Sequence, residues 1–162
     1  SHALIAYLLG AKKVIASDIG AHAKPSTLKW AISGSVLSLV RDILSPYEEH
    51  EEIRERLNYL SKIKFFDWGV LNELGIEYCA PINLAKESLN DPVDLIFSSS
   101  VLEHVYIDEV VPLLNNLSKS LHPNGEMFHG IHLEDHQDIQ HEPFKFLSID
   151  AKKYTEYIYC AH

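Results

Sequence analysis

Histidine and aspartate side chains are concentrated in the segment HGIHLEDHQDIQH, residues 129–141. Such side chains can bind a metal ion or exchange protons with a substrate, so their spacing has to decide between these roles. Because side chains alternate along a strand, His129 and His132 fall on opposite faces, and no H-E-x-x-H or cysteine-bearing motif is present. We therefore expect no metal and interpret His132, Asp135 and His136 as candidate substrate or acid–base residues. A polar loop that simply faces water is the alternative.

A carboxylate, Asp18, ends the apolar run in KKVIASDIG. At the end of a strand, a carboxylate can accept hydrogen bonds from both hydroxyls of a ribose. The alternative is a solvated aspartate that caps the next helix, and the strand context favours the ribose. Asn83 follows a second apolar run, where its amide could pair with an adenine ring or form an Asx turn before a helix.

The serines of SSSVLEHV follow a third apolar run, VDLIF. Ser100 and Glu103 have the S-x-x-E spacing of a capping box, in which each side chain satisfies a backbone N–H at a helix start. The box accounts for these two residues without a ligand. It leaves Ser98, Ser99 and His104 as pocket candidates, with a structural histidine as the equal alternative for His104.

The elements that would hold these residues alternate between strands and helices. We expect strands in KKVIASDIG, GIEYCAPINL, PVDLIFSSS and EMFHGIHL, helices over residues 3–9, 106–121 and 151–160, and a turn at HPNG. PVDLIFSSS is nearly all apolar, as in a strand covered on both faces. Residues 26–74 read as a long helical insertion after the first strand. This order predicts an α/β fold, a mostly parallel sheet with helices on both faces, in which ligands bind at the carboxyl ends of the strands.

Composition limits the possible partners. The 162 residues are 46% apolar and 23% charged, as in one ordinary globular domain, and 14 basic against 23 acidic residues give a net charge of −9. We therefore expect a small-molecule substrate, no nucleic acid and no membrane. No apolar run approaches the roughly 18 residues of a membrane span, and we expect no signal peptide in SHALIAYLLGAKKV. Cys79 and Cys160 indicate buried thiols in a reducing compartment, and we expect the cytoplasm.

Three segments in this order, KKVIASDIG, DLIFSSSVLEHV and LLNNLSKSLHPNGEMFHGIHL, resemble class I S-adenosylmethionine-dependent methyltransferases. The resemblance implies a Rossmann-like sheet and transfer of a methyl group from S-adenosyl-L-methionine to an unidentified small-molecule acceptor. In that family the second strand ends in the acid that binds the ribose, the fourth leads into S-x-x-[LV]-E-H beside the cofactor, and L-x-P-x-G introduces the fifth. The positions that match as cofactor-binding residues are Asp18, Ile19, Asn83, Leu84, Ser98, Ser99 and His104.

Two more segments match a subgroup of this family, and the chain departs from the family pattern in two places. HLEDH and PFKFL are similar to a subgroup with DH and PF-x-FL after the fifth strand, which makes His132, Asp135 and His136 candidate substrate or base residues. Asn83 stands where the family usually has an acid. The family's first strand and glycine-rich E-x-G-x-G loop have no counterpart in the chain.

The second departure leads us to expect one partial methyltransferase domain over residues 1–162, truncated at both ends and impaired in binding the cofactor. An exposed sheet edge or the helical insertion would then favour a homo-oligomer. Two other functions stay open. One is an NAD-dependent oxidoreductase fragment in which Asp18 keeps its ribose role. The other is a non-catalytic Rossmann-like domain that binds a partner through residues 26–74.

Overall fold

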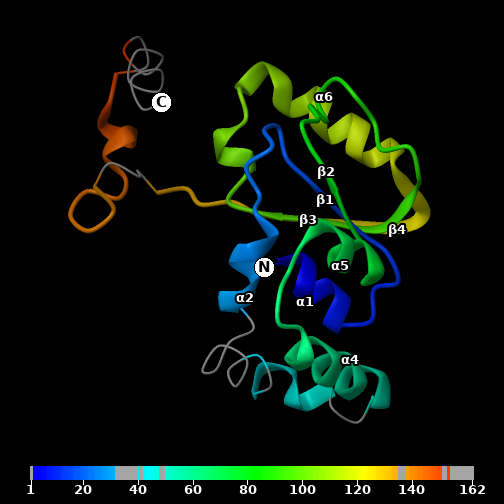
Figure 1. The fold of residues 1–162 in the computed structure, drawn as a ribbon. Helices are drawn as coiled ribbons and strands as arrows, with labels where there is room; N and C mark the ends of the chain where they lie inside the picture. The colour runs from blue at the N-terminus through cyan, green and yellow to red at the C-terminus, as the bar shows by residue number, and fades with distance from the viewer. Residues whose placement is uncertain are drawn as a thin grey trace. The chain divides into compact units, whose positions relative to one another are not determined.

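The computed structural model describes residues 2–31, 40, 42–47, 50–134, 138–150 and 153. The chain divides into two units, Ser1–Asn83 and Leu84–His162, each with its own pair of parallel strands. Helices and short parallel sheets make this a mixed α/β chain, as the sequence predicts (Figure 1). In the described ranges, no helix is both long enough and apolar enough to cross a membrane.

The first unit combines a parallel strand pair with several helices. Its elements are α1 His2–Leu8, β1 Val14–Ser17, the 3-10 helix η1 Pro25–Thr27, α2 Leu28–Ala31, η2 Ser45–Tyr47, α4 Glu51–Lys62, α5 Trp68–Glu73 and β2 Ile76–Cys79. β1 and β2 pair from Val14↔Ile76 to Ser17↔Cys79. The first predicted helix and the first two predicted strands are therefore confirmed, and the described part of residues 26–74 is largely helical.

The hydrophobic core of the first unit explains the placement of α4. Its sequence puts Ile53, Leu57 and Leu60 on one face, and all three are buried. They belong to one cluster with Leu4 and Leu8 of α1. Figure 1 shows α1 and α4 side by side. The charged face of α4 is left toward solvent.

The second unit is a strand–helix–strand arrangement. β3 Val93–Ser99 leads through η3 Leu102–His104 into α6 Ile107–Lys119, β4 Leu121–Gly130 pairs in parallel with β3, and η4 Lys145–Ser148 follows. The strand predicted in PVDLIFSSS is confirmed, and the helix predicted over residues 106–121 is α6 with slightly narrower bounds. The helix predicted over residues 151–160 lies outside the described residues, apart from residue 153.

The turn predicted at HPNG is wrong. These residues lie inside β4, where the register shifts from Val93↔Leu121 to Leu95↔Glu126, so that extra residues of β4 bulge out of the ladder. The strand predicted as EMFHGIHL therefore starts earlier, directly after α6. It also ends earlier, at Gly130.

The expectation that β3 is covered on both faces is also wrong. Burial alternates from Leu95 onward, and the side chains of Leu95 and Phe97 are 52% and 43% exposed. Phe128, the register partner of Phe97, is exposed as well. An apolar strand can thus have one open face, because an apolar run predicts burial only if other elements cover both sides.

Polar contacts attach the start of the second unit to the end of α6. The amide of Asn116 donates to the carbonyl oxygens of Leu84 and Ala85 over 3.2 and 3.1 Å. The buried hydroxyl of Ser120 donates to the Asn116 carbonyl and accepts from Leu89 N–H. These bonds place Leu84 beside the carboxyl-terminal turn of α6.

Candidate functional site

Asp18 lies directly beyond the carboxyl end of β1, where the sequence places it. Its N–H donates to the Cys79 carbonyl over 3.3 Å, and its own carbonyl accepts from Ile82 N–H over 2.9 Å. These bonds extend the pairing of the two strands and bring Asn83, the next residue, to the same edge. The Cys79 thiol is free and partly buried.

The Asp18 carboxylate is held by its own loop. Its Oδ1 accepts from Gly20 N–H over 3.2 Å, whereas its Oδ2 has no hydrogen bond within the described part of the chain. Asp18 does not cap the next helix, because that helix, η1, begins after Lys24 and has no side-chain cap. The neighbouring Ile19 side chain is 70% exposed. One half-engaged carboxylate and one exposed apolar side chain therefore sit together at the edge of the sheet.

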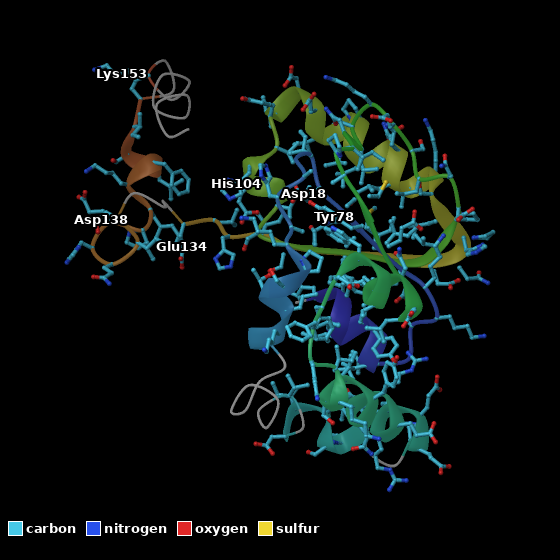
Figure 2. The ribbon with its side chains drawn as sticks, in the orientation of Figure 1. Asp18, Tyr78, His104, Glu134, Asp138 and Lys153 are labelled. Atoms are coloured by element: carbon cyan, nitrogen blue, oxygen red, sulfur yellow. The ribbon has the colours of Figure 1, made fainter. Side chains whose placement is uncertain are left out.

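Tyr78 of β2 completes this edge, and the sequence analysis did not single it out. Its hydroxyl donates to the Gly20 carbonyl over 3.0 Å and accepts from Ala23 N–H over 3.3 Å. Its ring stacks on Trp68, with centroids 5.1 Å apart and planes inclined by 4°. Figure 2 labels Asp18 and Tyr78, which come from neighbouring strands. The only signal in the sequence is an aromatic residue late in a predicted strand, which core packing explains equally well.

Ser98 and His129 form a second polar pair, in the other unit. They face each other in the register of β3 and β4, and Ser98 Oγ lies 2.7 Å from His129 Nδ1. His129 Nε2 is buried without a hydrogen-bond partner among the described residues. Burial lowers the pKa of the His129 imidazole, which favours the neutral ring. Sequence reasoning used His129 only to argue against a metal.

The capping box predicted for Ser100 and Glu103 is wrong. Residues 102–104 form a 3-10 turn without a side-chain cap, and α6 begins only at Ile107, so Glu103 is not in the first turn of an α-helix. Its Oε1 instead accepts from His132 N–H over 3.3 Å. Ser100 has a positive φ of 55° and donates its N–H to the Gly130 carbonyl.

The Glu103 carboxyl is ionised at neutral pH. Burial by itself would raise its pKa, but hydrogen bonds from the backbone N–H groups of Glu103 and His132 outweigh burial. The nearby imidazoles of His104 and His132 act in the same direction, so the pKa of Glu103 lies below its usual range. Its Oε2 is buried and has no partner within the described residues. A residue set aside as a cap is thus a carboxylate beside a predicted site histidine.

The predicted site residues fall into two groups, one in each unit. Within the first unit the structure brings together Asp18, Ile19 and Asn83. The second unit holds Leu84, Ser98, Ser99, His104 and His132, of which Ser98, Ser99 and His132 lie at or just beyond the carboxyl ends of β3 and β4. Asp135 and His136 lie outside the described residues.

Among the residues that the structure describes, no group of three or more His, Cys, Asp or Glu side chains is arranged to hold a metal ion. A shallow depression is lined by Lys12, Lys13, Asn72, Gly75, Ile76 and Glu77. It lies at the amino ends of β1 and β2, opposite the edge that carries Asp18, and an ion pair of Lys13 with Glu77 spans 3.3 Å there.

Comparison with protein-family models, curated proteins and solved structures finds no match for this chain.

Proposed function

We propose that this chain belongs to a class I S-adenosylmethionine-dependent methyltransferase and that Asp18 binds the ribose hydroxyls of the cofactor. The observation that carries the proposal is the position of the Asp18 carboxylate. It lies at the carboxyl end of a parallel strand pair, with one oxygen held by Gly20 N–H and the other without a hydrogen bond in the described part of the chain. Ligands of open parallel sheets bind at this edge.

The residues of the first unit fit a nucleoside. A carboxylate with a spare oxygen can accept from vicinal hydroxyls, and the exposed side chain of Ile19 offers an apolar contact to an adenine ring. Asn83 follows Ile82, whose N–H bonds to the Asp18 carbonyl, so Asn83 lies at the same edge and is the candidate to contact adenine. The cofactor, when bound, would supply an activated methyl group on a sulfonium.

Ser98, Ser99 and His104 of the second unit keep their role as cofactor and substrate candidates from the sequence resemblance alone. His132 is the candidate to accept a proton from an acceptor O–H or N–H, because it lies just beyond the carboxyl end of β4, where its backbone N–H donates to Glu103 Oε1. Asp135 and His136 keep this role as a proposal from the sequence. Methyl transfer otherwise depends mainly on aligning the two reactants.

Calorimetric titration of the chain with S-adenosylhomocysteine and, in parallel, with NAD tests the proposal. We expect millimolar or tighter binding of S-adenosylhomocysteine alone. Asp18→Asn keeps the shape of the side chain but removes its charge, and hydrogen bonds to a charged group contribute about 1.5–3 kcal/mol. The affinity should therefore fall roughly tenfold to a hundredfold.

Glu55→Gln is the matched control, because Glu55 is an exposed carboxylate of α4 in the same unit. It makes the same change in charge and should leave the affinity unchanged. Binding of NAD alone would favour the oxidoreductase. Binding of neither ligand would fit a non-catalytic domain and, equally, a methyltransferase domain that lacks its glycine-rich loop. An affinity for S-adenosylhomocysteine that Asp18→Asn does not alter would refute the role of Asp18.

A further inference from the structure

We propose that Tyr78 is a positioning residue that fixes the loop from Asp18 to Ala23 in the shape that presents the Asp18 carboxylate to a ribose. The inference rests on the proposed function and adds to it a residue that does not itself touch the ligand. It predicts that recognition of the ribose hydroxyls depends on a phenol group on the neighbouring strand.

The loop after β1 has few bonds of its own. Residues 18–24 form neither helix nor strand, and within them Gly20 N–H bonds to Asp18 Oδ1 and His22 N–H to the Gly20 carbonyl. The Tyr78 hydroxyl adds two bonds from outside the loop, one to Gly20 and one to Ala23. It therefore ties the residue that holds the carboxylate to the far side of the loop. A hydroxyl that donates and accepts at once fixes both partners.

Packing fixes the phenol in turn. Tyr78 pairs with Ala16 in the strand register, and its ring lies parallel to that of Trp68, the first residue of α5. The start of α5 is itself capped, since Asp67 Oδ1 accepts from Val70 N–H over 2.8 Å. A continuous series of contacts thus runs from the capped helix through two stacked rings to the loop of Asp18. Both rings have to stay in place for the hydroxyl to reach the loop.

Tyr78→Phe separates the hydroxyl from the ring. The variant keeps the stacking on Trp68, so the unit should remain folded, and urea unfolding checks this. It leaves Ala23 N–H without its acceptor and releases the loop. Tyr59→Phe is the matched control, because Tyr59 is a 48% exposed tyrosine of α4 in the same unit.

Two measurements on the full chain decide the proposal. Backbone ¹⁵N relaxation should show ordered Gly20, His22 and Ala23 amides in the wild type and in Tyr59→Phe, with order parameters falling below about 0.6 in Tyr78→Phe. Titration with adenosine and 2′-deoxyadenosine should show that the wild type prefers adenosine by roughly tenfold, as expected for a hydrogen bond to a charged group. In Tyr78→Phe, the ratio of the affinity for adenosine to the affinity for 2′-deoxyadenosine should fall to about threefold or less.

The outcomes separate this inference from the proposed function. If Tyr78→Phe keeps the wild-type preference for adenosine, the positioning role is overturned, whether or not the loop becomes mobile. If the loop keeps its order parameters, the phenol does not hold it and the inference fails directly. A wild type that binds neither nucleoside refutes the proposed ribose site and the positioning role with it, and the relaxation data then report only on loop packing.

Discussion

Ser98 Oγ and His129 Nδ1 lie 2.7 Å apart across the parallel strands β3 and β4. The imidazole therefore has one nitrogen engaged by a neighbouring strand, while its other nitrogen is buried without a partner among the described residues. Burial lowers the pKa of His129, because a charged ring is poorly solvated there. The pair consequently makes the stability of the second unit depend on pH.

The first prediction concerns that dependence. Above pH of about 6.5, the ordinary pKa of histidine, the ring is neutral in both the folded and the unfolded chain. As the pH falls below that value, His129 becomes protonated in the unfolded chain but stays neutral in the folded chain, so the free energy of unfolding decreases. The decrease ends when the pH reaches the lowered pKa of His129 in the folded chain. His129→Gln should remove this contribution. Urea unfolding of both proteins between pH 5 and 8 measures the difference.

His122→Gln is the control for this experiment, because His122 is an exposed histidine of the same strand. Its curve should run parallel to that of the wild type. If the curve of His129→Gln also runs parallel, burial of His129 does not control the pH dependence.

The second prediction concerns Arg56, which donates hydrogen bonds to carbonyl oxygens at the carboxyl end of α1. Its guanidinium donates to the carbonyl oxygens of Tyr7 and Ala11, the latter over 2.9 Å, and lies 4.7 Å from the centre of the Tyr7 ring. Arg56→Met should lower the free energy of unfolding by about 2 kcal/mol, since hydrogen bonds from charged donors contribute about 1.5–3 kcal/mol. Arg56→Lys should be intermediate, because an ammonium lacks the planar fork that reaches both oxygens.

The ion pair of Arg56 with Glu52 contributes much less in this interpretation. The Glu52 side chain is 66% exposed, so the 2.6 Å contact is screened by water. Glu52→Gln should therefore cost less than about 0.5 kcal/mol. Chemical denaturation compares the variants, and a loss in Glu52→Gln as large as that in Arg56→Met would show that the ion pair, rather than the carbonyl contacts, holds α1.

The third prediction concerns Leu60, the completely buried residue of α4. Leu60→Ala leaves a cavity in the cluster that also contains Leu4 and Leu8, and such truncations cost about 2–5 kcal/mol. Asn58→Ala, at an exposed position of the same helix, should change stability by less than about 0.5 kcal/mol. Equal effects in thermal unfolding would mean that α4 does not pack as described.

The sequence predicts the elements whose signals are local. Three strands and the helices α1 and α6 are found where local apolar patterns put them, and the fourth strand overlaps its predicted range but starts and ends earlier. Local patterns do not predict the bulge at HPNG, because the bulge depends on the register of β4 with β3. A proline and a glycine indicate a turn, but they also fit an extra loop of residues inside a strand.

In the candidate site, too, the sequence predicts the residues that have a local signal and misses the contacts between distant parts of the chain. Asp18 lies at its strand end as expected, because a strand followed by a polar loop is a local signal. Glu103 was misassigned because a four-residue motif cannot show that the turn is 3-10, nor that a backbone N–H 29 residues further on reaches the carboxylate. Tyr78 bonds to a loop 58 residues earlier in the chain, which no local pattern contains. Contacts of this kind require the fold.

The last prediction compares two glycines with positive φ. Gly75, which joins α5 to β2, has φ of 74°, and a Cβ there would lie 2.5 Å from the Lys12 carbonyl oxygen. Gly10, after α1, has φ of 103°, and a Cβ there would meet nothing within 4 Å. Gly10→Ala should cost about 1–2 kcal/mol from backbone strain alone. Gly75→Ala should cost more, because the Lys12 carbonyl cannot move without disturbing the approach to β1, where Val14 N–H bonds to the Gly75 carbonyl over 2.8 Å. Urea unfolding of the two variants tests the order, and an equal loss would mean that the close approach of Lys12 does not constrain this turn.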